Sequence, residues 1–280
     1  MADKGAPGVT TSCLVLALGW PRPVLLAECD PAGADLPWRV NGTSGPLVQG
    51  VGMVSLATSS RGVAGGHRRV WDHVQRLDGG LSVLVGPQAP EQAEAMGGAW
   101  GTIADLLAGV TDPDETAGTG VAGEVDVVAD CGRLLSRSSP AAAVLQRADL
   151  VVLVTRPTVS GVAHARHGLG VAARVLNDAP RAGSGLDRLA VLVVDDPRSP
   201  GSRKVQQREV GEVLDGTPGL QDVPVVGVLA HDPRAAAALA GLSPSGRGLD
   251  RSPLLLTARS AAATLAARAQ SLTATTQVRS

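Results

Sequence analysis

The sequence contains no phenylalanine and no tyrosine, and its only aromatic residues are four tryptophans. A hydrophobic core must therefore be built from leucine, valine and alanine. Proteins that bind single-stranded nucleic acid without sequence preference stack the bases on aromatic side chains. The scarcity of aromatic residues disfavours that class of function.

A surplus of charge is also missing, since the formal net charge at pH 7 is −1. Lys4 and Lys204 are the only lysines, so nearly all of the 25 basic residues are arginines, and these are scattered along the chain. Non-specific binding to DNA or to an anionic membrane needs a concentrated positive field. The charge pattern therefore gives no support to non-specific DNA binding.

Cysteines are few, and Cys13, Cys29 and Cys131 form no CxxC pair. This pattern favours reduced core residues over a disulfide framework or a zinc site, and we expect a cytoplasmic protein. No apolar run approaches the roughly 20 residues that span a bilayer, so no transmembrane segment is predicted. The apolar run 13–20 could belong to a signal peptide, but Asp3 precedes it and prolines interrupt it directly afterwards.

Hydrophobic residues make up 44% and charged residues 18% of the 280 positions, which is typical of a globular protein. Six short runs rich in valine and leucine have strand length and little polar alternation, as expected for strands covered on both faces. These runs are Pro23–Glu28, Leu81–Gly86, Val125–Asp130, Leu150–Thr155, Leu189–Val194 and Val223–Leu229.

Longer alanine- and arginine-rich stretches are predicted to be helices: Pro90–Val110, Ser139–Ala148, Ser160–Leu176, Lys204–Leu214 and Leu255–Leu272. The segments Asn41–Gly66 and Thr111–Gly123 are predicted to be loops. Strands that alternate with helices predict an α/β fold, a doubly wound and mainly parallel sheet with helices on both faces. We expect one domain over residues 1–272 and a polar C-terminal tail over residues 273–280.

The stretch from Lys4 to Thr11, Lys-Gly-Ala-Pro-Gly-Val-Thr-Thr, is followed by a helix-like run. Small residues let backbone amides approach a phosphate closely, and a helix N-terminus adds aligned N–H groups. The pattern predicts an anion-binding loop. A Gly/Pro turn that opens an ordinary helix is the alternative.

This stretch resembles the deviant Walker A loop of the ParA/MinD family of P-loop ATPases, Lys-Gly-Gly-x-Gly-Lys-Thr-Thr. The resemblance implies binding of ATP and Mg²⁺, with Thr10 as a metal ligand and Lys4 as a catalytic residue that reaches a phosphate across a homodimer interface. The implied nucleotide-binding residues are Gly5, Ala6, Pro7, Gly8, Val9, Thr10 and Thr11.

Val9 departs from the family pattern, which has the Walker lysine at this position. A lysine there neutralises charge on the β/γ-phosphates during phosphoryl transfer, and valine supplies no charge. ATP hydrolysis is therefore expected to be weak or absent.

A second motif follows the run Pro23–Glu28, which leads into Cys29-Asp30-Pro31. Ligands of open α/β sheets lie beyond the carboxyl ends of strands, which places Glu28 and Asp30 near the loop. The pattern is similar to the acidic-x-Asp-Pro turn of the same family, which implies that Asp30 orients the attacking water and that Glu28 lies near the metal. Surface carboxylates of an ordinary turn are the alternative.

A third strand, Asp126–Asp130, ends in an aspartate and resembles a Walker B motif, which implies that Asp130 holds Mg²⁺ through water. If the three motifs share one switch point, Thr10, Asp30 and Asp130 converge at one end of the sheet. We predict this convergence.

The start of the chain departs from the resemblance, because only Met1, Ala2 and Asp3 precede Lys4. The family has a whole central strand there, and a strand takes about five residues. Either the chain starts downstream of its natural start or the sheet lacks most of this strand. We predict a truncated first strand, with at most a fragment formed by residues 1–3.

Other patterns carry less weight. Residues 118–123 match GxGxxG, but they precede a strand, whereas a dinucleotide fingerprint follows a strand and opens a helix. His164 and His167 could share a helix face, yet no third metal ligand has suitable spacing. The family's adenine-contacting asparagine is also unmatched, since Asp195-Asp196-Pro197 stands at its place.

Together these residues imply a nucleotide-dependent switch, a homodimer that binds Mg-ATP and positions or assembles an unidentified protein partner, as in partitioning. A scaffold of the same fold that does not turn over ATP is the alternative. An unrelated α/β enzyme, such as a dehydrogenase, is a third interpretation.

Overall fold

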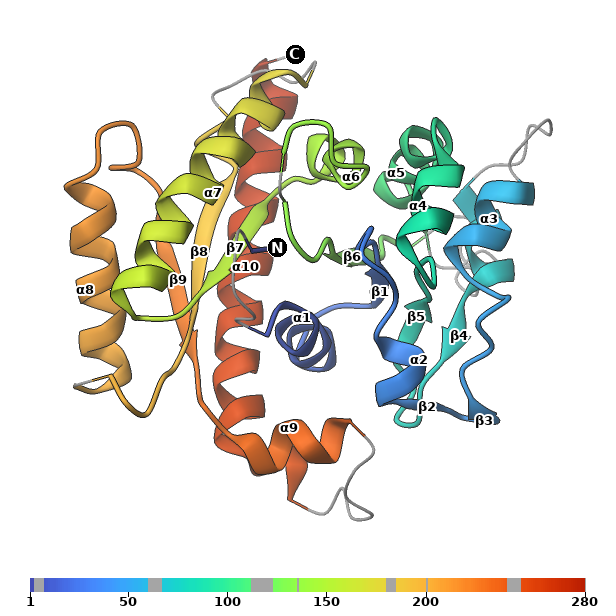
Figure 1. Ribbon diagram of the computed structural model, residues 1–280, viewed down its shortest axis with the longest axis horizontal. Helices are drawn as coiled ribbons and strands as arrows, with labels where there is room; N and C mark the ends of the chain where they lie inside the picture. Colours follow the sequence, from blue (N-terminus) through green and yellow to red (C-terminus); the bar gives the residue numbers. More distant parts are fainter. Residues whose placement is uncertain are drawn as a thin grey trace.

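The computed structural model describes residues 1–2, 8–59, 67–111, 123–134, 136–179, 185–199, 201–240 and 248–279. Its strands form two larger sheets and a short hairpin of β2 with β3 (Figure 1). The larger sheets have the orders β4-β5-β1-β6 and β7-β8-β9. The strands are β1 Val24–Glu28, β2 Asn41–Gly42, β3 Gly45–Pro46, β4 Gln75–Arg76, β5 Ser82–Leu84, β6 Asp126–Asp130, β7 Val151–Thr155, β8 Leu189–Val194 and β9 Val225–Leu229.

Neighbouring strands in the two larger sheets are parallel, except for the antiparallel pair of β4 and β5. Near-continuous apolar strands suit this arrangement because both of their faces are covered. In β8, for example, all residues from Leu189 to Val193 are buried. Each of the six apolar runs contains one of these strands, so the predicted mainly parallel sheet structure is confirmed.

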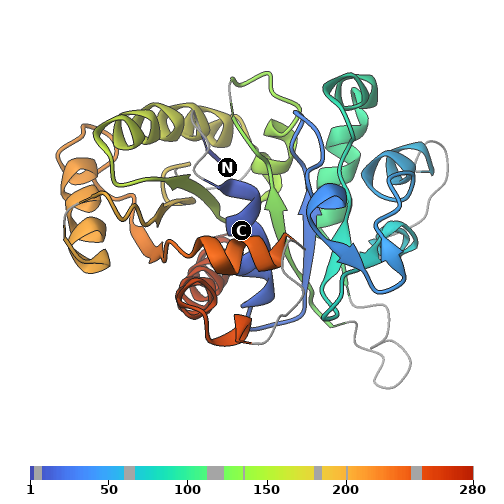
Figure 2. The ribbon, with the colours of Figure 1, turned by 60° about the horizontal axis from the view of Figure 1, so that its bottom comes forward.

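Helices cover both faces of the strands, with α7 on one face and α1 and α10 on the other (Figure 2). This arrangement confirms the doubly wound α/β class. The helices are α1 Val9–Leu18, α2 Leu36–Arg39, α3 Met53–Ser59, α4 Pro90–Met96, α5 Ala99–Ala108, α6 Ala142–Arg147, α7 Val159–Asn177, α8 Arg203–Asp215, α9 Pro233–Leu239 and α10 Pro253–Arg279, with short 3₁₀ helices η1 His67–His73 and η3 Leu249–Arg251.

Three stretches differ from the prediction. The single helix expected over Pro90–Val110 is broken into α4 and α5 at Gly97, whose φ of +49° is left-handed and ends the first helix. The loop expected over Asn41–Gly66 contains β2, β3 and α3. Helix α10 continues past the expected end at Leu272 to Arg279. Most of the loop expected over Thr111–Gly123 lies outside the described residues.

The first two residues lie between the two larger sheets. Ala2 forms an isolated parallel bridge with Arg133, which follows β6. The N-terminal ammonium group of Met1 donates to the carbonyl oxygen of Val152 in β7 at 3.0 Å. Met1 and Ala2 therefore form the fragment of a central strand that the sequence predicted, and Asp3 lies outside the described residues.

The core is filled by aliphatic side chains, among them the fully buried Leu25, Leu84 and Leu192. Of the tryptophans, Trp100 is 3% exposed and donates its indole N–H to Ala93 O at 2.9 Å, whereas Trp38 is 75% exposed. None of the described helices is long and apolar enough to cross a membrane.

Candidate functional site

The ends of β1 and β6 bring acidic side chains to one edge of the sheet. Glu28 pairs with Asp130 in the parallel register, so both strands end side by side. A Cβ atom built on Gly132, which has φ of +51°, would lie 1.9 Å from Asp30 Oδ2. Glycine at position 132 is therefore required for the Asp30 carboxylate to lie against the segment that follows β6. Asp30 and Asp130 share an edge, as the sequence predicted.

Asp130 has an unusual environment for a carboxylate. Asp130 is only 1% exposed to solvent. Oδ1 accepts the N–H of Gly132 at 3.0 Å, whereas Oδ2 has no hydrogen-bond partner among the described residues. A buried polar atom without a partner is costly, and such an atom in a native protein calls for a water, an ion or a ligand.

Asp30 occupies the turn that follows β1. Its Oδ1 accepts the N–H of Ala32 at 2.8 Å, and its carbonyl oxygen accepts the N–H of Gly33 at 3.2 Å. Burial, and then the negative charge of Asp130, raise the pKa of Asp30 against the opposing effect of the Ala32 hydrogen bond. A carboxyl group with a raised pKa at a strand end is a typical feature of functional sites.

Glu28 is buried and fully engaged with backbone groups. Its Oε1 accepts the N–H groups of Asp35 and Leu36 at 2.6 and 2.9 Å, and Oε2 accepts the N–H of Gly86 at 3.2 Å. Burial raises the pKa of Glu28 to about 7 despite these three hydrogen bonds. Glu28 thus ties β1 to the start of α2 and to the segment after β5, and the metal contact that the resemblance implied for it stays a prediction.

Helix α1 begins directly after Gly8, which has φ of 88°. Ser12 donates its N–H to Gly8 O at 2.8 Å, so the N–H groups of Val9, Thr10 and Thr11 have no acceptor within the helix. No acidic residue lies in the first turn, and the helix packs against β6. This helix end is suited to an anion because N–H groups without an acceptor in the helix and the helix dipole both favour negative charge.

The Val9 side chain belongs to the core and not to this polar edge. It is 9% exposed and lies in an apolar cluster with Cys13, Leu14 and Leu26. The rest of the predicted loop, Lys4, Gly5, Ala6 and Pro7, lies outside the described residues. The predicted roles of those four residues stay predictions.

Arg39 stands beside the first turn of α1, and no sequence motif indicated it. Its Nη1 donates to Thr11 Oγ1 at 3.4 Å, and its Nη2 forms an ion pair with Asp35 at 2.8 Å. The side chain is 41% exposed. A cation therefore lies near the helix end where Val9 supplies none. Its position depends on how α2 packs, which no spacing rule in the sequence reveals.

The donor atoms at this edge fit a magnesium ion. Mg²⁺ is usually held by one or two carboxylates together with water and substrate phosphates. The candidate contacts are Asp130 Oδ2 and the hydroxyl of Thr10 in the first turn of α1, and the Asp30 carboxylate lies at the same edge as Asp130. Nowhere in the described ranges do three or more His, Cys, Asp or Glu side chains form a metal-binding group, so His164 and His167 gain no further ligand.

Asp196 and Arg198 form an ion pair in the segment after β8. Asp196 is 1% exposed and accepts two hydrogen bonds from the Arg198 guanidinium at 2.9 and 3.0 Å. This pairing holds the pKa of Asp196 below its usual range. The carboxylate is thus engaged within the protein at the place where the expected adenine-contacting asparagine is missing.

Neither a protein-family model nor a curated protein matches the sequence. Solved structures do match. The cell division ATPase MinD of Pyrococcus furiosus has a TM-score of 0.62 and 16% identity, over 95% of this chain and 96% of that chain. A ParA family ATPase from Chlorobium tepidum has a TM-score of 0.58 and 16% identity, over 93% of this chain and 95% of that chain. The chain has the MinD/ParA fold.

A further structure with the MinD/ParA fold was solved with a bound nucleotide. MinD of Pyrococcus horikoshii, complexed with Mg-ADP, has a TM-score of 0.54 and 18% identity, over 94% of this chain and 92% of that chain. These likenesses show the fold of the chain alone. The chemistry of this chain has to be argued from its own residues.

Proposed function

We propose that the chain is a nucleotide-binding switch, with Mg²⁺ and ATP or ADP held between the start of α1 and the ends of β1 and β6. The observation that carries this proposal is the buried Asp130 Oδ2, which has no partner in the described part of the chain and lies at the same sheet edge as Asp30. Mg²⁺, when bound, would neutralise phosphate charge. The N–H groups at the start of α1 would bind phosphate oxygens.

The individual roles follow from the surroundings of each side chain. Asp130 would hold the metal through water, and Thr10 would add a hydroxyl ligand from the first turn of α1. Asp30 would orient the attacking water, since its carboxylate lies beside Gly132 at the same edge. Glu28 would act by positioning, because its three backbone hydrogen bonds hold the surrounding segments in place.

Weak or absent hydrolysis is part of the proposal. Phosphoryl transfer depends on positive charge at the transferred phosphate, and the buried Val9 supplies none. Loss of one positioned electrostatic group costs on the order of 10²–10³ in rate. Arg39 would supply part of the missing charge within a subunit, and Lys4 would supply it across a homodimer.

Dimerisation and partner binding extend the proposal by analogy. MinD of Aquifex aeolicus was solved as a MinC:MinD complex, and it matches this chain with a TM-score of 0.55 and 14% identity, over 95% of this chain and 93% of that chain. A switch of this kind would pair two nucleotide-bound copies and then position or assemble a protein partner in the cytoplasm. The alternative, a scaffold without turnover, is favoured by the burial of Val9 in the core.

Calorimetric titration of the full chain with ADP and with AMPPNP, with and without Mg²⁺, tests the proposal. We expect Mg²⁺-dependent binding that is weakened at least about tenfold, or about 1.4 kcal/mol, by Asp130→Asn. Arg39→Ala should weaken binding whether or not Mg²⁺ is present. Arg208→Ala is the matched control, because Arg208 is 65% exposed and forms its ion pair with Glu212 of the same helix, α8. If the folded chain binds no nucleotide, the proposed switch is wrong and the scaffold interpretation is favoured.

A further inference from the structure

The outer face of α7 borders a groove that lies apart from the candidate nucleotide site. The inner face of this helix packs against β7 and β8 and buries Leu169, Ala172 and Leu176. On its other side α7 lies beside α8 (Figure 1). Between α7 and the turn after α8, the surface is hollowed to a volume of about 490 Å³. Ligand pockets have volumes of about 300–1,000 Å³, so this groove is large enough to hold a ligand.

The wall opposite α7 is a turn that is held by its own hydrogen bonds. Thr217 donates its hydroxyl to Val213 O at 2.7 Å, and Leu220 donates its N–H to Thr217 O at 3.0 Å. Gly219 has a φ of +81° and donates its N–H to Gln221 Oε1 at 2.9 Å. The Leu220 side chain is buried in the main hydrophobic core and anchors the turn. The wall is therefore preformed, which lowers the free-energy cost of ordering it when a ligand binds.

The charge along the groove is positive. Arg166 and His167 line it from α7, and no aspartate or glutamate belongs to its described lining. Arg166 is exposed and forms no ion pair or hydrogen bond within the described ranges of the chain. Asp178, just beyond the end of α7, is already paired with Arg137. The positive charge of Arg166 is thus available to an anionic ligand.

Asn177 adds a hydrogen-bond donor near the C-terminal end of α7. Its Oδ1 accepts the N–H of Gly185 at 2.9 Å, so its Nδ2 amino group is the part of the side chain that can serve a ligand in the groove. At a rise of about 1.5 Å per residue, Arg166 and Asn177 lie roughly 16 Å apart along the helix axis. An extended peptide rises about 3.3 Å per residue, so about five residues span this distance. A single small anion cannot reach both side chains.

The lining also has an apolar part. Ala173 of α7 contributes to it, together with Leu186 and Leu220 from the segments opposite. An aliphatic side chain of the ligand would lose contact with water here, which is favourable. Nucleic acid fits poorly, because its affinity depends on many phosphate contacts and the groove offers only one arginine.

We propose that this groove binds an extended acidic peptide segment of a partner protein. A carboxylate of the peptide pairs with Arg166, an acceptor about five residues away takes the Asn177 amino group, and an aliphatic side chain lies between them. That this partner belongs to the nucleotide switch rests on the proposed function, whereas binding of the peptide itself does not.

The probe is a random seven-residue peptide library displayed on phage, with the full chain as target and no nucleotide present. We expect the enriched peptides to carry Asp or Glu together with Leu, Ile or Val. Fluorescence anisotropy then measures the affinity of an enriched peptide, which should fall at least about tenfold when its acidic residues are replaced by Asn and Gln. Affinity should also fall as the salt concentration rises, because the ion pair with Arg166 is screened.

Two groove variants and a control locate the binding. Arg166→Glu reverses the charge, and Gly170→Leu fills the groove, since a Cβ on Gly170 would meet only Arg174 Nη1, at 3.6 Å. Both should weaken peptide binding at least about tenfold without lowering the Tm. Arg208→Glu is the control, because Arg208 is exposed in α8 and does not line the groove, and it should leave the affinity unchanged.

Several results would contradict the proposal. Enrichment of peptides without acidic residues, or equal affinity for the wild type and both groove variants, would overturn it. Glutarate, a free dicarboxylate, should compete at least about tenfold less well than the peptide, and equal competition would make the groove a small-anion site and overturn the assignment to a peptide. A chain that binds Mg-ADP but no acidic peptide would refute this proposal alone. A chain that binds the peptide but no Mg-ADP would support the groove and refute the switch.

Discussion

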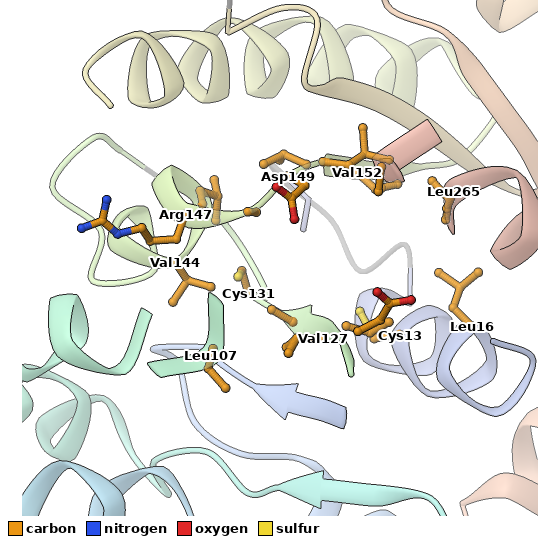
Figure 3. Close-up of a pocket in the computed structure, with 18 of the residues that line it drawn as sticks. Cys13, Leu16, Leu107, Val127, Cys131, Val144, Arg147, Asp149, Val152 and Leu265 are labelled. Carbon is orange, nitrogen blue, oxygen red and sulfur yellow. The ribbon is translucent and has the colours of Figure 1, made fainter. Parts of the chain in front are cut away.

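The two sides of β6 are built in opposite ways. On the side of β1 the strand is paired along its whole length, and it ends at a polar edge with Glu28, Asp30 and Asp130. On the side of β7 it faces a cavity of about 250 Å³ (Figure 3), lined mainly by apolar side chains, across which Met1 and Ala2 form hydrogen bonds among the described residues. The acidic half of the candidate site therefore lies at the end of fully paired strands, whereas among the described residues Met1 and Ala2 link β7 to the segment after β6.

The largest expected effect contrasts leucine truncations on the two sides. Leu25 in β1 is fully buried in the packed core, whereas Leu107 is equally apolar but lines the cavity. Leu25→Ala should lower the free energy of unfolding by about 3–4 kcal/mol, and Leu107→Ala by about 1–2 kcal/mol, because a side chain beside a void has fewer contacts to lose. Urea denaturation measures both losses, and equal losses would contradict the cavity.

The next effect is the pH dependence of the unfolding free energy that arises from Glu28, at the end of β1. Its pKa is raised from 4.5 to about 7 in the folded protein, so the folded state binds more protons than the unfolded state between these values. The stabilising contribution of Glu28 is present below pH 4.5 and is lost as the pH rises through about 7. The free energy of unfolding should fall by on the order of 2–3 kcal/mol over this range. Urea denaturation across this pH range should show the loss in the wild type and a smaller slope in Glu28→Gln. An identical slope in both proteins would show that Glu28 does not cause the pH dependence.

A smaller effect is expected at Gly132, where the paired side and the cavity side meet. Gly132→Ala should destabilise the fold by about 1–3 kcal/mol and weaken nucleotide binding, because the new Cβ meets the Asp30 carboxylate at a left-handed φ. Asp30→Ala in the same chain should relieve most of the clash. A double-mutant cycle of unfolding free energies measures the coupling, and strict additivity would show that the two residues do not touch.

The smallest expected change comes from restoring charge to the loop. Val9→Lys should increase the affinity for Mg-nucleotide by about tenfold or less, since the side chain must leave the core to reach a phosphate. Wild-type hydrolysis should be near background, and Asp30→Asn should abolish any turnover of the Val9→Lys protein while leaving binding largely intact. Rapid wild-type hydrolysis that survives both Lys4→Ala and Asp30→Asn would contradict these roles.

The sequence was sufficient for the parts of the molecule that depend on local pattern. The apolar runs located the strands, and the parallel arrangement then placed Asp30 and Asp130 at one edge. Arg39 and the engagement of Glu28 by Asp35, Leu36 and Gly86 could not be predicted, because they depend on how the turn after β1 packs against the segment after β5.

The cavity shows the same limit of sequence reasoning. The short stretch before Lys4 predicted a truncated first strand. It did not predict whether the flanking strands would close up or stay apart, which depends on the helices packed above and below them. Similarly, the predicted helix Pro90–Val110 included Gly97, and the positive φ of this glycine, which ends α4, could not be predicted from the sequence pattern.

Amide exchange with and without Mg-ADP tests most directly whether the nucleotide site lies at the start of α1 and the carboxyl ends of β1 and β6. Bound nucleotide should slow exchange at the start of α1, in the turn after Asp30 and in the segment 130–134. It should leave exchange in α8 and β9 unchanged, and Asp130→Asn should raise the Mg-ADP concentration needed for protection at least about tenfold. Protection centred on α8 or β9, or no protection at saturating Mg-ADP, would contradict the proposed site.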